Sequence, residues 1–334
     1  MTNGLRGGID LGGAKVQAVV VDQEHRPLGT ARGATPADGG PPAIAEAMSQ
    51  ALGEAARDAG VELSTLLGVG ACSPGDVDEA TGVVTNAANL DGWAGVSFPL
   101  AEELGRRLGT TVRVGNDVNM ATLGEFRLGA AKPYDSVLGV FWGTGVGGGL
   151  ILDGKPWTGR GGAGEIGHTV VDRHGRRCPC GNRGCMEAYA GRGAMERAAR
   201  EAHDHGRKTR LFKIMEERGR DRLTSGVWER ALEHGDKVAA ALMEDAVDAL
   251  GTAIGSAVNL IDVPAVVLGG GMGLRFASRV REQLEGHMLE HLFNRDDPPA
   301  LLVAELGDLG GAIGAALLVL EGQGSDAAAP ASAT

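Results

Sequence analysis

Apolar residues recur in two patterns along the chain, and each pattern predicts a different kind of element. Continuous apolar runs interrupted by a glycine turn predict strand–turn–strand hairpins at residues 7–22 and 137–153. Apolar positions three and four apart predict amphipathic helices at 42–59 and 98–109. The stretch from roughly 192 to 250 is charged and helical, and we expect its Arg and Glu side chains to form solvated helix faces. This alternation indicates an α/β protein.

One further feature suggests that the architecture is duplicated. The second hairpin repeats the first at an offset of 131 positions, which aligns Gly143 with Gly12, Val140 with Ile9 and Asp153 with Asp22. The matched segments are short and rich in glycine, so chance is an alternative to duplication. Near the end of the chain, "AVVLGGGMG" predicts a buried strand that runs into a third glycine loop, and residues 307–322 predict a closing helix.

Length and charge narrow the class of protein. A chain of 334 residues with 43 % hydrophobic content can bury a substantial core and predicts two domains. The net charge of −11, with no basic stripe to offset it, argues against non-specific binding to nucleic acid or anionic membranes. No apolar run is long enough to span a membrane, so we expect a cytoplasmic protein whose tail, 323–334, is disordered.

The glycine loops indicate a phosphate-binding site. "GTGVGGG" contains G-x-G-x-x-G at Gly143, Gly145 and Gly148, but an apolar strand follows where a dinucleotide fold would have a helix. A glycine hairpin can instead present backbone N–H groups to an anion, and three such loops favour a nucleotide over simple tight turns. Asp10 lies two residues before Gly12, where an acid would hold Mg²⁺ beside a phosphate or serve merely as a polar turn residue.

"TVRVGND" places Asn116 and Asp117 where a predicted strand hands over to a helix. Both residue types are preferred helix N-caps, so either side chain can be only a cap. The alternative is catalytic: phosphoryl transfer to an alcohol needs a carboxylate to accept the hydroxyl proton, and ligands gather at strand ends in α/β sheets. The residues alone leave the two interpretations equally supported.

Three of the four cysteines, Cys178, Cys180 and Cys185, stand in "CPCGNRGC" with the spacing C-x-C-x4-C. This spacing lacks the C-x-x-C of redox proteins, and structural zinc is more consistent with it than a disulfide is. Zinc needs a fourth ligand, for which His168 and His174 are both candidates. The fourth cysteine, Cys72, stands alone and is expected to be a small buried core residue.

With these motifs assembled, the chain resembles the ROK family of bacterial sugar kinases and repressors, and specifically its glucokinase branch. The resemblance covers about residues 5 to 322 and rests on "GIDLGGAK", "NLDGW", "GNDVNMATLGE", "GTGVGGGL", "GGAGEIGH", "CPCGNRGCMEAY" and "VVLGGGM". It implies the two-domain actin-like ATPase/hexokinase (ribonuclease H-like) fold with an interdomain cleft. We expect a small domain at 1–118, with helix 308–322 packing back on it. A large domain would cover 119–307, including a zinc-binding loop at 168–187 and a helical insertion.

The resemblance also implies roles for individual residues. It makes Asp117 the base that activates the sugar hydroxyl, and it settles the fourth zinc ligand as His168, with Cys178, Cys180 and Cys185, against His174. Sugar contacts are implied for Asn89, Asn116, Asp117, Glu165, His168 and Glu187. ATP contacts are implied for Gly12, Gly13, Lys15, Gly143, Thr144 and Gly145, with Gly270 and Gly271 near the adenosine and Asp10 near Mg²⁺.

The activity implied is transfer of a phosphoryl group from ATP to a hexose, most simply to the 6-hydroxyl of glucose, by a homodimer or homotetramer. Two departures from the family pattern bear on this: Ala14 stands where Thr or Ser is usual, which leaves polyphosphate open as the donor, and Asp91 replaces the proline of "NLPGW". N-acetylhexosamine and fructose kinases are therefore alternatives, as is a sugar sensor without catalysis. Repressors of the family carry a winged helix before the first glycine loop, which here starts at Gly7, so we expect an enzyme.

Overall fold

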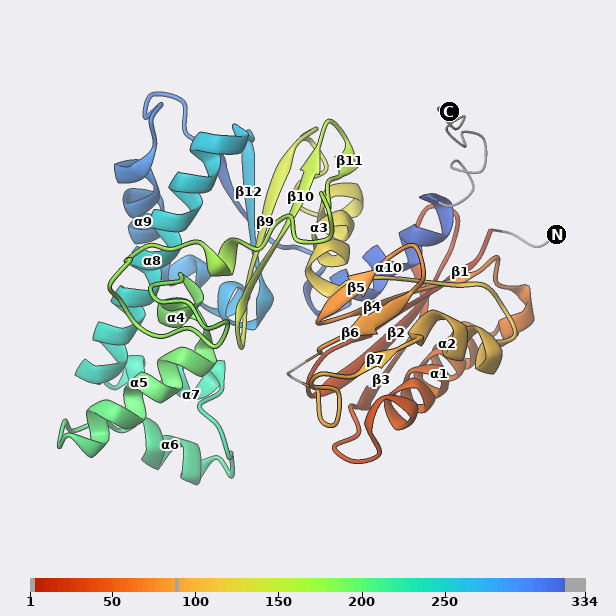
Figure 1. Cartoon of the computed structure of the whole chain (residues 1–334), viewed down its shortest axis with the longest axis horizontal. Helices are drawn as coiled ribbons and strands as arrows, with labels where there is room; N and C mark the ends of the chain where they lie inside the picture. Colours follow the sequence, from red (N-terminus) through yellow and green to blue (C-terminus); the bar gives the residue numbers. More distant parts are fainter. Residues whose placement is uncertain (1–3, 88–89, 322–334) are drawn as a thin grey trace, which may run out of the picture. The chain divides into compact units, whose positions relative to one another are not determined.

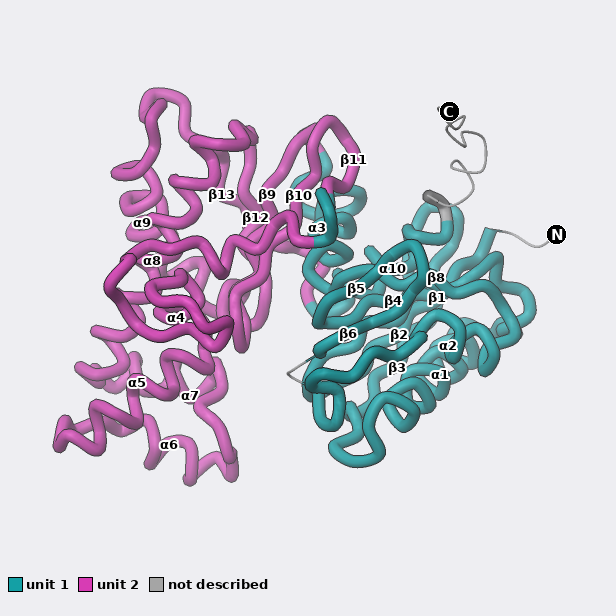
Figure 2. Tube along the Cα trace, in the orientation of Figure 1, with its two compact units in different colours: residues 1–132, 158–161, 308–334 teal, residues 133–157, 162–307 magenta. Residues whose placement is uncertain are grey.

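The computed structural model describes residues 4–87 and 90–321, and it divides into two compact units (Figure 2). The first unit combines residues 1–132 with 158–161 and 308–334, and the second combines residues 133–157 with 162–307. Each unit is built on its own mixed five-stranded sheet. In the part of the chain that the structure describes, no helix is both long and apolar enough to cross a membrane.

The sheet of the first unit has the strand order β3-β2-β1-β4-β8. Strands β1 to β4 of this sheet are labelled in Figure 1. An antiparallel hairpin forms one side of the sheet, and two strands parallel to β1 continue the other side. Its strands are β1 (Arg6–Leu11), β2 (Lys15–Val21), β3 (Pro27–Ala34), β4 (Val69–Ser73) and β8 (Val112–Asn116). A small second sheet consists of β5 (Asp76–Asp78), β6 (Val83–Thr85) and β7 (Ser97–Phe98).

Helices cover both faces of this first sheet. Consecutive strand residues point to opposite faces, and a Cβ added at Gly7 would meet Leu52 of α1 (Gly40–Asp58), whereas one at Gly8 would meet Ala312 of α10 (Gly310–Glu321). The expected helices at 42–59 and 98–109 are α1 and α2 (Leu100–Leu108). Apolar residues of α1, α2 and the sheet form one core cluster.

Helix α10 lies unusually close to the sheet because glycines face it. A Cβ on Gly70 would lie 1.7 Å from the carbonyl oxygen of Ala315, and one on Gly8 would lie 1.9 Å from that of Ala312. Helix α3 (Asp117–Leu128) packs on α10 in the same way, at Gly314. The first unit includes α3 and extends to residue 132.

The second unit repeats this topology. Its sheet has the order β11-β10-β9-β12-β13, again with an antiparallel hairpin followed by strands parallel to the first strand of the hairpin. The strands are β9 (Val137–Trp142), β10 (Val146–Leu152), β11 (Lys155–Pro156), β12 (Ala265–Gly269) and β13 (Ala300–Val303). Both hairpins predicted from the sequence are present, as β1–β2 and β9–β10, and the matching strand orders favour duplication over chance.

Long helices carry much of the core of the second unit. Helices α8 (Lys237–Ile261) and α9 (Gly270–His291) pack together at Gly251, where a Cβ would lie 2.4 Å from the Cβ of His287. Buried Asp236 caps α8 by accepting from the N–H groups of Val238 and Ala239, each at 2.9 Å. The shorter helices are α4 (Glu187–Ala190), α5 (Arg192–Asp204), α6 (Leu211–Glu217) and α7 (Ser225–Glu233).

The close approach of α10 predicts the effect of substituting Gly70. Gly70→Ala should lower the free energy of unfolding by about 1–3 kcal/mol, because either α10 or the strand must shift to admit the methyl group. Gly53→Ala is the matched control, because a Cβ there meets nothing within 4 Å. Since alanine favours a helix more than glycine does, this change should raise the free energy of unfolding by about 0.5–1 kcal/mol. Urea unfolding of both variants measures the difference. Equal stabilities would show that α10 is not held against the sheet at this distance.

Candidate functional site

The glycine loop of the second unit, Gly143–Gly145, is held from behind by the first turn of α5. The N–H of Arg192 donates to the carbonyl of Gly143 at 3.1 Å, and that of Gly193 donates to the carbonyl of Thr144 at 3.0 Å. Within the loop, the N–H of Gly143 donates to the carbonyl of Gly145 at 2.9 Å. These bonds satisfy donors at the start of α5 that the helix itself leaves unpaired.

The same bonds fix the direction of the loop amides. A trans peptide group holds its N–H opposite to its C=O, so a carbonyl turned toward α5 turns the next N–H away from the helix. This applies to the N–H groups of Thr144 and Gly145, neither of which donates a hydrogen bond within the residues that the structure describes. Two neighbouring backbone donors are thus available to an anion, as the sequence predicted for this loop.

The third glycine loop lies beside the second, because β12 pairs with β9. Gly270 has a φ of +78°, and a Cβ there would lie 2.5 Å from the carbonyl oxygen of Trp142, so only glycine fits. Helix α9 begins at this residue, and its first N–H groups and positive dipole end favour an anion. A Cβ at Gly271 would meet nothing within 4 Å, which leaves the approach to the helix end open.

In the first unit, the loop between β1 and β2 is tied to the end of β3. The Thr35 hydroxyl donates to the carbonyl of Gly12 at 2.7 Å, and the Thr35 N–H donates to that of Ala14 at 3.3 Å. Gly13 and Ala14 are exposed at the tip of the loop. Lys15, expected to face phosphates, pairs with Asp308 at 2.7 Å. A phosphate at this loop would therefore compete with Asp308 for the lysine.

Asp10 lies partly buried close to the carboxyl end of β1. The Cys72 thiol, on the neighbouring strand β4, donates to Asp10 Oδ1 at 3.2 Å, and Gly311 of α10 leaves room for the carboxylate. Burial raises the pKa of Asp10, because it disfavours the charged form, and holds the pKa of the Cys72 thiol well above its usual value. A cation beside Asp10 would offset the cost of burying its ionised carboxylate. This is consistent with the expectation that Asp10 lies near Mg²⁺. Cys72 is buried as expected, but it is also a partner of this acid.

Asn116 and Asp117 have different structural roles. Asn116 is the N-cap of α3: its side-chain oxygen accepts from the N–H groups of Val118 at 3.0 Å and Asn119 at 3.2 Å. Asp117 is the first helical residue, and its Oδ1 accepts from Val118 at 2.9 Å. Because Asn116 supplies the cap, α3 does not need Asp117 for that purpose.

The other expected sugar contacts of the first unit are only partly described. The capping bonds occupy the side-chain oxygen of Asn116, so this residue can offer a ligand only its amide N–H groups. Asn89 lies outside the described residues. In the same loop, Asp91 is exposed, whereas Trp93 is fully buried, with its indole N–H 3.4 Å from the carbonyl of Val84.

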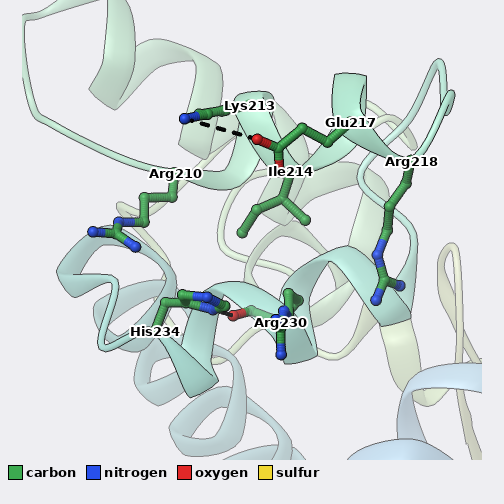
Figure 3. A pocket seen from close by; sticks show the side chains of 7 residues that line it. All are labelled: Arg210, Lys213, Ile214, Glu217, Arg218, Arg230 and His234. Atoms are coloured by element: carbon green, nitrogen blue, oxygen red, sulfur yellow. Dashed lines mark hydrogen bonds and ion pairs between the residues drawn. The ribbon is translucent and has the colours of Figure 1, made fainter.

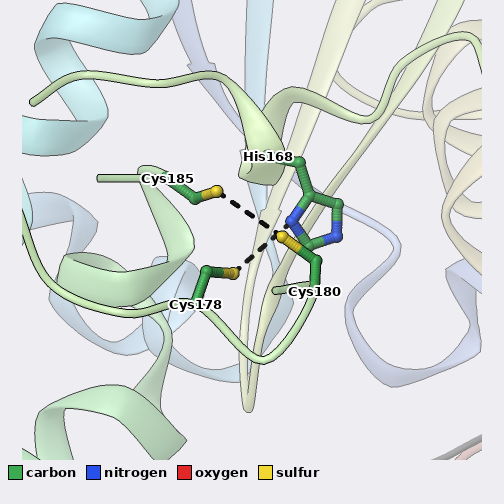
Figure 4. Close-up of side chains that lie close together, drawn as sticks. All are labelled: His168, Cys178, Cys180 and Cys185. Carbon is green, nitrogen blue, oxygen red and sulfur yellow. Dashed lines mark hydrogen bonds between the residues drawn. The ribbon is translucent and has the colours of Figure 1, made fainter. Parts of the chain in front are cut away.

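His168, Cys178, Cys180 and Cys185 form one cluster, with their ligand atoms all within 4.8 Å of one another (Figure 4). His168 Nδ1 lies 3.7 Å from Cys178 Sγ, and the Sγ atoms of Cys180 and Cys185 are also 3.7 Å apart. The thiols are free, and burial raises the pKa of Cys178 to about 12. One imidazole and three sulfurs are a donor set that fits tetrahedral zinc. His174 is not part of the cluster, and its ring nitrogen instead contacts Arg173.

The predicted sugar-binding residues of the second unit lie next to this cluster. His168 directs Nδ1 toward the sulfurs, and its Nε2 lies 3.9 Å from Glu165. Glu187 follows Cys185 by two residues, and its Oε2 accepts from the N–H of Val146 at 2.9 Å. A Cβ on Gly167 would lie 3.6 Å from the Cβ of Glu187. The two ends of the cluster loop, residues 168–187, therefore lie next to each other.

A pocket that the sequence did not predict lies between α6 and α7, with a volume of about 380 Å³ (Figure 3). Its lining is mainly basic: Arg210, Lys213, Arg218, Arg230 and His234, with Ile214 and Glu217. Several of these cations already have partners, among them Lys213 with Glu217 at 3.7 Å. The pocket contains no glycine loop and none of the predicted site residues, so we do not assign it to catalysis.

Arg192 is the functional candidate that sequence reasoning missed. We expected the charged residues from 192 onward to be solvated, but the guanidinium of Arg192 is partly buried and donates to Thr144 Oγ1 at 2.7 Å. The position of Arg192 just after "CMEAYAG" gave no signal for this contact, because the contact depends on how α5 meets the glycine loop.

Two units with the same sheet topology, each opened by a glycine hairpin, define a protein of the actin-like ATPase fold. The chain belongs to the ROK family, which it matches over residues 6–322. The family boundaries enclose every site residue described above.

Relatives named for two different activities are similar to this chain over nearly its full length. The chain is 30 % identical to a glucokinase from Thermotoga maritima over 320 residues, which is 94 % of this chain and 96 % of that protein. It is 33 % identical to an N-acetyl-D-glucosamine kinase from Salmonella heidelberg, over 94 % of this chain and 98 % of that protein. A ROK family glucokinase from Streptomyces griseus, solved in complex with glucose and AMPPNP, superposes with a TM-score of 0.79 and 32 % identity, covering 95 % of this chain and all of that one.

The cluster predicts about one zinc ion per chain. Cys180→Ser should remove most of the metal, because it takes away one of four ligands, while Cys72→Ser, outside the cluster, should retain it. Elemental analysis of the purified protein, wild type and both variants, measures the content. A folded wild-type protein without bound metal would show that the cluster is only a group of packed thiols.

Proposed function

We propose that the protein is an ATP-dependent hexose kinase that phosphorylates glucose at the 6-hydroxyl, with Asp117 as the general base. The observation that carries this proposal is the position of the Asp117 carboxylate at the N-terminus of α3, directly after β8, where Asn116 supplies the N-cap. Similarity to glucokinases over nearly the whole chain supports the choice of sugar.

The proposed reaction is in-line attack of the sugar oxygen on the γ-phosphorus of ATP. The new O–P bond forms as the bond to the β-phosphate oxygen breaks and ADP leaves, while the sugar hydroxyl proton passes to the Asp117 carboxylate. The N–H groups of Thr144 and Gly145 orient and stabilise the phosphates, and Asp10 would hold Mg²⁺. Mg²⁺, when bound, offsets phosphate charge.

Further roles in the proposal rest on family membership. Asn116, Glu165, His168 and Glu187 would bind the remaining sugar hydroxyls, and zinc would hold the cluster loop that carries His168 and Glu187 in place. The contacts of His168 support this dual role, because one ring nitrogen faces the sulfurs and the other faces Glu165. We further propose that the enzyme is cytoplasmic and acts as a homodimer or homotetramer.

An N-acetylhexosamine is the second candidate substrate, since N-acetyl-D-glucosamine kinases are as similar to this chain as glucokinases are. The exposed Asp91 is where the chain departs from the glucokinase pattern.

Asp117→Asn should lower kcat by about 10²–10⁴-fold, because the amide cannot accept the hydroxyl proton. The amide oxygen can still accept from Val118, so the fold and sugar affinity should change little. Asp135→Asn, at an exposed position, is the control and should retain wild-type turnover. Steady-state kinetics and calorimetric glucose binding separate the two effects. Near-normal turnover of Asp117→Asn would remove Asp117 from the mechanism.

A coupled ADP-release assay across glucose, mannose, fructose, N-acetylglucosamine and N-acetylmannosamine tests the substrate. We expect the highest kcat/KM with glucose and ATP, and lower activity when polyphosphate replaces ATP. Preference for N-acetylglucosamine would support the second candidate. Sugar binding without phosphorylation of any sugar would contradict the kinase proposal and indicate a sensor.

A further inference from the structure

Arg192 places a positive charge directly beside the glycine loop of the second unit. Its Nη2 donates to Thr144 Oγ1 at 2.7 Å, and its Nη1 donates to the carbonyl of Leu223 at 3.4 Å. Both acceptors are neutral. Of the five N–H donors of a guanidinium, these two bonds engage two, so others remain for a ligand.

Among the described residues, no carboxylate oxygen lies within 4.0 Å of the guanidinium of Arg192, so it forms no direct ion pair there. Glu196, one turn further along α5, pairs with Arg200 at 2.6 Å and accepts from the N–H of Leu223 at 3.0 Å. Burial lowers the pKa of Arg192, the charge of Glu196 raises it, and the charge of nearby Arg222 lowers it. A partly buried cation that forms no direct ion pair becomes more favourable when an anion joins it.

The side chain is not needed to anchor the loop. The backbone N–H groups of Arg192 and Gly193 already hold the carbonyls of Gly143 and Thr144, and any residue other than proline at position 192 would supply the same bonds. What the arginine adds is a charge, on the side chain that reaches Thr144. The two loop N–H groups that donate no hydrogen bond within the described residues belong to Thr144 itself and to the next residue, Gly145.

We propose that Arg192 binds the phosphate chain of the phosphoryl donor at the Gly143–Gly145 loop, where its guanidinium supplies the counter-charge to the di- or triphosphate. This inference rests on the proposed kinase function and adds to it a phosphate-binding residue. A guanidinium suits the role because its fork can contact two phosphate oxygens at once. The same chemistry would bind a nucleotide or an inorganic polyphosphate.

Nucleotide binding to the full-length protein tests this assignment. Isothermal titration with ADP, AMP and adenosine, in the presence of Mg²⁺, should show that Arg192→Gln weakens ADP binding by about 10–100-fold, the range for a charge-assisted hydrogen bond. The effect should be smaller for AMP and absent for adenosine. Arg192→Lys should restore part of the ADP affinity. Arg230→Gln, which removes one positive charge from α7 in the same unit, should bind all three ligands as the wild type does.

The outcomes separate this inference from the kinase proposal. An equal loss of affinity for ADP and adenosine would assign Arg192 a purely structural role and overturn the inference, as would unchanged ADP affinity with wild-type thermal stability. Dependence of ADP affinity on Arg192 in a protein that phosphorylates no sugar would support the inference and contradict the kinase proposal. Wild-type protein that binds no nucleotide would contradict both. Titration of the wild type and Arg192→Gln with tripolyphosphate shows whether a phosphate chain without a nucleoside is sufficient for binding that depends on Arg192.

Discussion

Two backbone hydrogen bonds, from the first turn of α5 to the carbonyls of Gly143 and Thr144, determine how the second unit presents its glycine loop. They turn the following amides away from the helix, and they bring the side chain of Arg192 onto Thr144. Beyond the loop, the N–H of Val146 donates to the Glu187 carboxylate, so both ends of the loop are fixed. These bonds restrain a flexible glycine segment, which would reduce the entropy lost if the loop binds an anion as proposed.

The two units share a strand order but support their glycine loops by different means. In the first unit, Thr35 at the end of β3 binds the loop carbonyls, and α10 covers the neighbouring Asp10 through Gly311. In the second unit, the N-terminus of α5 and the carboxylate of Glu187 hold the glycine loop. Duplication thus accounts for the sheets and hairpins, whereas the residues that hold the loops have diverged. The match between the two hairpins at an offset of 131 positions therefore revealed the repeated strands and glycines, but not the residues that hold each loop.

Much of the fold could be predicted from the sequence, because local patterns specify it. Apolar runs and glycine turns located both hairpins, and the C-x-C-x4-C spacing located the cluster, whose fourth ligand came from family resemblance. Features that depend on packing between distant segments could not be predicted in this way. The extension of the first unit through α3 depends on the contact of that helix with α10. Similarly, a charged residue at the start of a helical pattern gave no indication that Arg192 would be partly buried against a loop almost fifty positions earlier.

The position of Glu187 links the cluster to the glycine loop. Glu187 is two residues from Cys185 in the chain, and its carboxylate holds the N–H of Val146, so an ion that orders the cysteines also orders one support of the phosphate site. If the two proposed sites share this support, their binding is reciprocal: the factor by which the metal raises affinity for the phosphate ligand is the factor by which that ligand raises affinity for the metal. Depletion of the metal would then reduce affinity for the phosphate ligand, and a bound phosphate ligand would in turn raise the affinity for the metal.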